Sequence, residues 1–405
     1  MNSPFSIFSK LYLCLMICLL AVILSILSTK VFPQPTIKKD FPGQSCYQFP
    51  LPVGLEIAQI ESDNIQNIPL IRNFKFLESI NLVSGKVNWS FDAGGTISRR
   101  NLVNSEFTFL ANKSKKKNSI TDSNNGTENK LIFRSISNYS GLVVWQTETD
   151  GEFTLNSTDK SQSYQIFLYD LKDSLLVHSN GCFIRVNKTD GQTIWKKCIE
   201  HQLANPNNIN VRTNPDVNSF ILDISGSILA FSDRKHIYLL ELQTGEIISK
   251  TRTEVEITAI VSTDRSNVIY GTKRGFIRAL DTDSKKSFWS IKIGGEISGI
   301  IKTDKGLLVS SFDNFIYMLD INKGHKIWKK RFAGRLTGKS SVNGNLAIVV
   351  GDRRNSYFLD LSDGKILRQI SLTEDESFLQ THGFINEYSF LSTDKRILVF
   401  RNGSC

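Results

Sequence analysis

The sequence predicts an all-β fold: a β-propeller of four-stranded blades, eight or alternatively seven in number, preceded by one N-terminal transmembrane helix. Three observations lead to this prediction. A short motif recurs seven times at spacings of 39 to 56 residues, short apolar segments flank its copies, and an uncharged apolar stretch stands near the N-terminus. Regular repeats of about 40 residues, each containing several short strands, are typical of propellers.

The apolar stretch comprises residues 11–28 (LYLCLMICLLAVILSILS), which contain no charge and lie between Lys10 and Lys30. This length is at the short end of what spans a bilayer and is long for the core of a signal peptide. Neither a small-x-small cleavage site nor a lipoprotein cysteine is evident. We therefore expect an uncleaved signal anchor over residues 1–30 and a linker over 31–44. The chain would then be a single-pass membrane protein with its propeller on the exported side, periplasmic or extracellular. A cleaved signal peptide is the alternative.

The repeated motif lies within residues 45–405. Each copy contains a short apolar strand, commonly an Asp or Asn, then a turn with Gly and a Trp four positions after the Gly, as in residues 320–328 (DINKGHKIW). Three copies lack one member, because Ser249 and Arg368 stand where Trp is expected and position 285 lacks the Gly. The residues assigned to the structural repeat are Gly85, Trp89, Gly141, Trp145, Gly191, Trp195, Gly245, Trp289, Gly324, Trp328 and Gly364.

Each repeat is interpreted as a four-stranded antiparallel sheet. In the clearest unit the strands are expected at 296–303, 306–311, 315–320 and 325–332. The Gly supplies the positive φ that a tight hairpin turn requires, and the Trp offers a large apolar plate that wedges between neighbouring blades. Because one sheet cannot bury both of its faces, several units must stack into a ring. A β-sandwich with unrelated hairpins would not keep a constant offset between Gly and Trp.

The ring needs one additional strand for its closure. Eight third strands are expected, the last at residues 396–401, but only seven are followed by a fourth strand before Cys405. Residues 45–49, just before the first unit, can supply the missing strand. This placement would bring Cys46 close to Cys405, where a disulfide would lock the ring.

A second pair of cysteines, Cys182 and Cys198, stands on the third and fourth strands of one unit, nearly equidistant from its turn. A cross-strand disulfide is expected there if the hairpin register allows it. The four cysteines outside the apolar stretch permit three pairings, and buried free thiols are the alternative.

The net charge of +10 does not point to nucleic acid. The basic residues are dispersed, and we find no arginine stripe with interleaved aromatic residues, no zinc-ligand spacing and no basic helix. A general affinity for anionic lipid or polysaccharide surfaces is the interpretation that we prefer. The densest basic run, at 113–117, lies in a polar segment over residues 112–130 that lacks an apolar period. This segment is expected to be a disordered surface insertion.

The motif Asp-x-x-x-Gly-x-x-x-Trp, followed shortly by Gly94 and Gly95 in one copy and by Gly294 and Gly295 in another, resembles the PQQ-like repeat. This repeat is found in quinoprotein alcohol dehydrogenases and in the BamB family, the propeller lipoproteins of the outer-membrane β-barrel assembly machinery. The resemblance implies a propeller over residues 45–405. It is weak for function, because one propeller architecture serves many unrelated tasks.

The residues that an enzyme of this class would need are not found in the sequence. Quinoprotein dehydrogenases carry two adjacent cysteines beside the cofactor, a calcium site and a catalytic Asp, whereas no two cysteines are adjacent here and no Cys-x-x-Cys-His is present. The histidines are scattered; they are His178, His201, His236, His325 and His382. We therefore assign no catalytic, cofactor-binding or metal-binding residue, no cofactor and no small-molecule substrate.

The predicted function is that of a non-enzymatic, membrane-anchored propeller scaffold that mediates protein–protein interactions in the cell envelope. Its expected partners are envelope or membrane proteins, with the N-terminal helix in the membrane and no nucleic acid. A propeller that binds carbohydrate or another envelope polymer is the alternative, and a PQQ-dependent dehydrogenase is disfavoured. The helix, in place of a lipoprotein cysteine, is the main departure from the BamB family.

Overall fold

A computed structural model describes residues 47–401 apart from 51–54, 58, 61–66, 73–74, 82–85, 98–101, 104–105, 116–128, 150–166, 180–181, 200–220, 234, 264–266, 337–339, 352–353 and 386–387. These residues form 34 strands. No helix long and apolar enough to cross a membrane occurs in the described part of the chain. The anchor predicted over residues 1–30 and the linker over 31–44 lie outside it.

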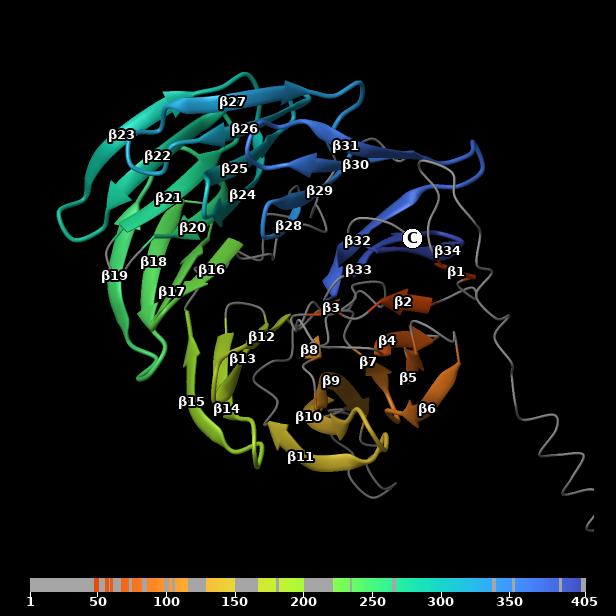
Figure 1. Ribbon diagram of the computed structural model, residues 1–405. Coiled ribbons are helices and arrows are strands. Elements are labelled where there is room, and N and C mark those ends of the chain that lie inside the picture. Colours follow the sequence, from red (N-terminus) through yellow and green to blue (C-terminus); the bar gives the residue numbers. More distant parts are fainter. Residues whose placement is uncertain are drawn as a thin grey trace, which may run out of the picture.

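The strands assemble into eight sheets arranged in a ring: seven have four strands, and one has six (Figure 1). The sequence predicted eight blades or alternatively seven, and the regular four-stranded build occurs seven times. The six-stranded sheet lies between the first four-stranded blade and the next one along the chain (Figure 1).

The first part of the ring contains the enlarged unit. The first blade consists of β2 (Leu55–Ile57), β4 (Asn67–Arg72), β5 (Phe76–Asn81) and β6 (Val87–Asp92). The six-stranded sheet consists of β3 (Gln59–Ile60), β7 (Thr96–Ile97), β8 (Leu102–Val103), β9 (Phe107–Lys115), β10 (Asn129–Ser137) and β11 (Val143–Thr149).

The middle of the ring is regular. Its first two blades are β12 (Phe167–Asp170), β13 (Ser174–Ser179), β14 (Cys182–Asn187) and β15 (Thr193–Cys198), and then β16 (Ile221–Ser225), β17 (Ile228–Ser232), β18 (His236–Glu241) and β19 (Ile247–Arg252). Its next two blades are β20 (Ile257–Ser262), β21 (Asn267–Thr272), β22 (Phe276–Asp281) and β23 (Lys286–Lys292), and then β24 (Ile297–Thr303), β25 (Gly306–Ser311), β26 (Phe315–Leu319) and β27 (Lys326–Arg331).

Two blades complete the ring. They are β28 (Ser341–Asn343), β29 (Leu346–Val350), β30 (Asn355–Asp360) and β31 (Ile366–Ser371), followed by β32 (Phe378–Ile385), β33 (Tyr388–Thr393) and β34 (Arg396–Arg401) together with β1 (Tyr47–Pro50).

The hydrophobic core lies between successive blades. The second strands β17 and β25 are buried along their whole length, whereas the outer strands β19 and β27 contain both partly covered and exposed residues. One continuous cluster joins Ile269 and Ile277 of one blade to Val309 and Tyr317 of the next. Since each sheet is covered by its neighbours, burial of apolar surface holds the ring together.

The ring is closed by a strand from the N-terminal side. β1 pairs antiparallel with β34, with Tyr47 opposite Val399 and Pro50 opposite Arg396. The sequence predicted a closing strand at residues 45–49, and the described strand occupies 47–50. Cys46 and Cys405, the proposed lock, lie outside the described residues, so their disulfide stays a prediction.

The two ends of the predicted insertion at residues 112–130 are strands in the structure. β9 continues to Lys115 and β10 begins at Asn129, and these two residues are directly paired. The remainder of that segment, residues 116–128, lies outside the described part of the chain. The ladder of backbone hydrogen bonds between two long strands extends β structure into polar sequence that composition alone marks as a loop.

Candidate functional site

The repeat residues meet between blades. Trp328 packs on Gly364 of the following blade, where a Cβ would lie 2.7 Å from the indole Cε3. The indole Nε1 of Trp328 donates a hydrogen bond to the Leu361 carbonyl at 2.9 Å. The same arrangement, a Trp on the Gly of the next unit, occurs in the pairs Trp89–Gly141, Trp145–Gly191, Trp195–Gly245 and Trp289–Gly324. Gly85 lies outside the described residues.

Two neighbouring copies, one without the Trp and the next without the Gly, support the pairing of Trp with the Gly of the next unit. Ser249 replaces the Trp, and its hydroxyl donates at 3.3 Å to the Thr282 carbonyl, which occupies the position that accepts the indole hydrogen bond elsewhere. The turn that faces Ser249 carries Lys285 in place of Gly, with φ at 56°. Positive φ therefore favours Gly, and the close approach of the indole is what requires it. Where the indole is missing, a side chain fits.

A bulge in each outer strand directs the Trp towards the next blade. In β27 the register with β26 shifts so that Ile327, the residue before Trp328, has no partner. Bulges of this kind re-aim the neighbouring side chain. The bulged residue is apolar and exposed in six successive units. In chain order these residues are Val144, Ile194, Ile248, Phe288, Ile327 and Leu367.

The acidic residues of the motif cap turns. The Asp320 carboxylate accepts hydrogen bonds from the backbone N–H groups of Asn322 and Lys323 at 3.0 and 2.7 Å. The backbone N–H of Ser362 likewise holds the pKa of Asp360 below its usual value. These carboxylates stabilise the turn conformation.

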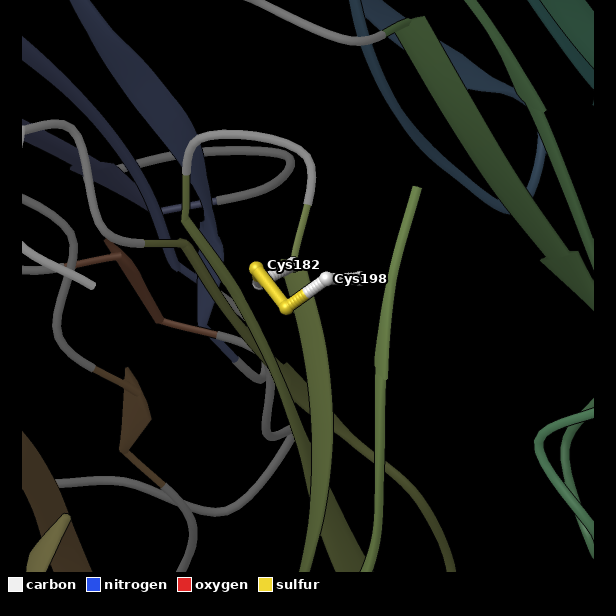
Figure 2. The surroundings of a disulfide bond; sticks show 2 residues. All are labelled: Cys182 and Cys198. Carbon is white, nitrogen blue, oxygen red and sulfur yellow. A yellow bond between two sulfur atoms is a disulfide. The ribbon is translucent and has the colours of Figure 1, made fainter. Parts of the chain in front are cut away.

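Cys182 and Cys198 are directly opposite each other on β14 and β15 and are joined by a disulfide, with their Cα atoms 4.0 Å apart (Figure 2). The bond closes the end of the hairpin farthest from its turn. The disulfide therefore links the outer strand β15 covalently to the third strand β14 of the same blade.

Titratable side chains outside the Gly-containing turns of the motif make structural contacts. The Asp233 carboxylate accepts hydrogen bonds from the Tyr238 hydroxyl at 2.9 Å and interacts with His236 Nδ1 at 3.0 Å. Burial and this carboxylate raise the pKa of Tyr238 well above its usual value. His178 is buried and stacks on Phe183, with ring centroids 4.5 Å apart. Within the described residues, no group of three or more His, Cys, Asp or Glu side chains could hold a metal ion.

The hairpin between β10 and β11 departs from the polar pattern of its siblings. We call its residues Tyr139, Leu142, Val143 and Val144 the apolar tip; their exposed fractions are 97, 69, 41 and 50%. The position two before the turn Gly holds Tyr139 here but Thr189, Gln243, Asp283, Asn322 or Ser362 in the other described copies. The position after the Gly holds Leu142 here but Gln192, Glu246, Lys286, His325 or Lys365 elsewhere.

The strand β11, whose first two residues belong to the apolar tip, is an open sheet edge. β11 ends the strand order of the six-stranded sheet. The outer strands β15, β19, β23, β27 and β31 each carry at least one Lys or Arg, whereas β11, like β6, carries none. Lysines on edge strands discourage pairing with other chains. β11 has no such cation, and it begins with the exposed aliphatic side chains of the apolar tip.

The sequence did not single out the apolar tip. The Gly141 motif and the apolar residues around it were assigned to the repeat, because apolar residues near a turn fit a strand. A comparison of the copies position by position would have shown that Tyr139 and Leu142 replace polar residues.

These features define the class of the protein: a β-propeller of PQQ-like repeats whose blades are joined by Trp-on-Gly contacts. Residues 233–381 match the family described as "Outer membrane protein assembly factor BamB". Among curated proteins, none matches the sequence.

Other solved structures share the fold. The crystal structure of BamB from Moraxella catarrhalis matches with a TM-score of 0.57 and 13% identity, over 88% of this chain and 99% of that chain. The computationally designed Ika8 protein matches with a TM-score of 0.62 and 11% identity, over 91% of this chain and 100% of that chain. At these identities the likeness concerns the fold alone.

Proposed function

We propose that the protein is a non-enzymatic, membrane-anchored scaffold that binds other proteins of the cell envelope, with the apolar tip and the β11 edge as its docking surface. The observation that carries the proposal is the exposure of Tyr139 and Leu142 at turn positions that are polar in every other described copy. The match to an assembly-factor family over residues 233–381 supports the same class of function.

The chemistry of this surface suits a protein partner. Burying a side chain such as Leu142 against a partner contributes about 1.5–3 kcal/mol, and Tyr is among the residues enriched at interface hot spots. An extended segment of the partner could pair with the free backbone groups of β11, since strand addition uses open sheet edges. The side chains of the apolar tip would then select the apolar residues of that segment.

Cross-linking of the full chain in native membranes tests the proposal. Tyr139→Ser combined with Leu142→Gln should abolish the specific cross-linked species, and Val144→Lys should weaken them by giving the edge a cation. The matched control changes the same turn positions of the β14–β15 hairpin, Thr189→Ser and Gln192→Asn, and should leave the species unchanged. The same cross-linked proteins recovered with both double variants would refute docking at the tip. Recovery of the chain alone from the wild type would refute the scaffold function.

A further inference from the structure

A different part of the rim combines positive charge with exposed apolar residues. The outer strands β15, β19, β23, β27 and β31 contain eleven basic residues and no acidic residue. The highest density is on the neighbouring strands β23 and β27. Their six cations are Lys286, Lys292, Lys326, Lys329, Lys330 and Arg331.

These six cations, which we call the basic rim, are not neutralised within the described protein: none of them forms an ion pair with a described carboxylate. Three of them lie over aromatic rings of the adjacent third strands. Lys292 lies 5.4 Å from the Phe276 ring centroid, and Lys329 lies 5.5 Å from that of Phe315. Lys326 lies 5.7 Å from the centroid of Tyr317. Rings on the blade thus hold cations at the surface.

The bulged residues add an apolar component on the same two strands. Phe288 is 60% exposed in β23, and Ile327 is 53% exposed in β27. Edge protection against aggregation accounts for lysines on these strands, but it does not account for an exposed Phe beside them. Cations next to exposed aromatic and aliphatic side chains are the composition of surfaces that bind the interface of an anionic bilayer.

We propose that the basic rim, together with Phe288 and Ile327, binds the headgroup region of an anionic lipid bilayer. Cations pair with lipid phosphates, and the two apolar side chains enter the interface between headgroups and acyl chains. A soluble polyanion would satisfy the cations but would leave the apolar side chains in water, so the bilayer suits both components. This contact is separate from the apolar tip and does not depend on it.

Lysine footprinting of the full chain on vesicles tests the contact. The chain is mixed with phosphatidylcholine vesicles, or with vesicles that also contain phosphatidylglycerol, and the rate of acetylation of each lysine is measured by mass spectrometry. Lys292 and Lys329 should be protected severalfold by the anionic vesicles alone, and moderate salt should reduce the protection. Lys75 and Lys305, which lie outside the basic rim, are internal controls and should react equally with both kinds of vesicle. This comparison holds whether or not the N-terminal stretch inserts, because both vesicles would accept it.

Variants separate charge from apolar contact. Each cation removed should weaken bilayer association about fivefold. Lys292→Gln with Arg331→Gln should therefore lower the protection of Lys329 strongly, whereas Lys196→Gln with Lys197→Gln on β15 removes the same charge and should not. Phe288→Ser with Ile327→Ser should lower protection while all the cations remain.

Equal reactivity of Lys292 and Lys329 with both vesicles would overturn the proposal. Protection by soluble dextran sulfate that equals the protection by anionic vesicles, together with no effect of Phe288→Ser and Ile327→Ser, would identify a polyanion site and would also overturn it. Variants that lose protection only because they aggregate are recognised by their sedimentation without vesicles, and the wild-type footprint still decides the question.

Discussion

Substitution of Gly364 measures how much the contact between Trp328 and Gly364 contributes to the stability of the ring. Its φ is 71°, and an added Cβ would lie 2.7 Å from the Trp328 ring. For Gly364→Ala, the left-handed backbone conformation costs about 1–2 kcal/mol, and overlap with a rigid, hydrogen-bonded indole adds about 1–3 kcal/mol. We therefore expect the free energy of unfolding to fall by about 2–5 kcal/mol.

A matched control separates the effect of the indole contact from the cost of the backbone conformation. Gly344 has φ of 55°, and an added Cβ there would meet nothing within 4 Å. Gly344→Ala should cost only the conformational part, about 1–2 kcal/mol. Urea unfolding of the full chain, followed by far-ultraviolet circular dichroism, provides both values. Equal losses for Gly364→Ala and Gly344→Ala would refute the argument that the indole requires the Gly.

A double variant tests the same coupling without reference to Gly344. In a Trp328→Ser background the chain copies the natural pair Ser249 and Lys285, so Gly364→Ala should then cost about 1–2 kcal/mol instead of the larger value. An unchanged cost in the Ser background would show that strain elsewhere, and not the indole, determines the effect.

Two further predictions concern the disulfide and the pH dependence of stability. Cys182 and Cys198 are 16 residues apart. Replacing both by Ser should therefore lower the free energy of unfolding, measured by urea unfolding, by about 3 kcal/mol. An unchanged midpoint would show that the bond does not constrain the unfolded chain. Burial tends to raise the pKa of Asp233, but its hydrogen bonds with Tyr238, backbone N–H groups and His236 outweigh this and lower it. The carboxylate therefore stabilises the fold above the pKa of an unfolded Asp, about 4, and this contribution is lost as the pH falls through the lower folded value. Asp233→Asn should flatten the decline of the thermal midpoint below pH of about 4, and an equally steep decline would contradict the assignment.

Much of the fold was predictable because the repeat is local. The turn chemistry and the alternating strands lie within about 40 residues, and they predict a four-stranded unit without any knowledge of its neighbours. The closing strand followed from the number of third and fourth strands, and β1 pairs with β34. The ends of the segment at 112–130 were wrong, because pairing between Lys115 and Asn129 depends on the partner strand and not on composition.

The apolar tip, which we propose as a docking surface, was not singled out from the sequence. Tyr139 and Leu142 are ordinary residues for a strand, and their exposure depends on where the hairpin ends in the folded ring. The bulge that exposes Phe288 and Ile327 is likewise a matter of register between two strands.

The sequence by itself determined that the chain is a propeller of Gly- and Trp-containing units, because four of the seven copies have both residues at the same offset. Only the tertiary structure decided which Gly each Trp contacts. Trp328 and Gly364 belong to different copies, and they meet because stacking of blades brings the outer strand of one unit against the turn of the next. The offset between Gly and Trp within one copy reflects the geometry of a single blade. The contact between a Trp and the Gly of the next copy exists only once the blades have stacked into the ring.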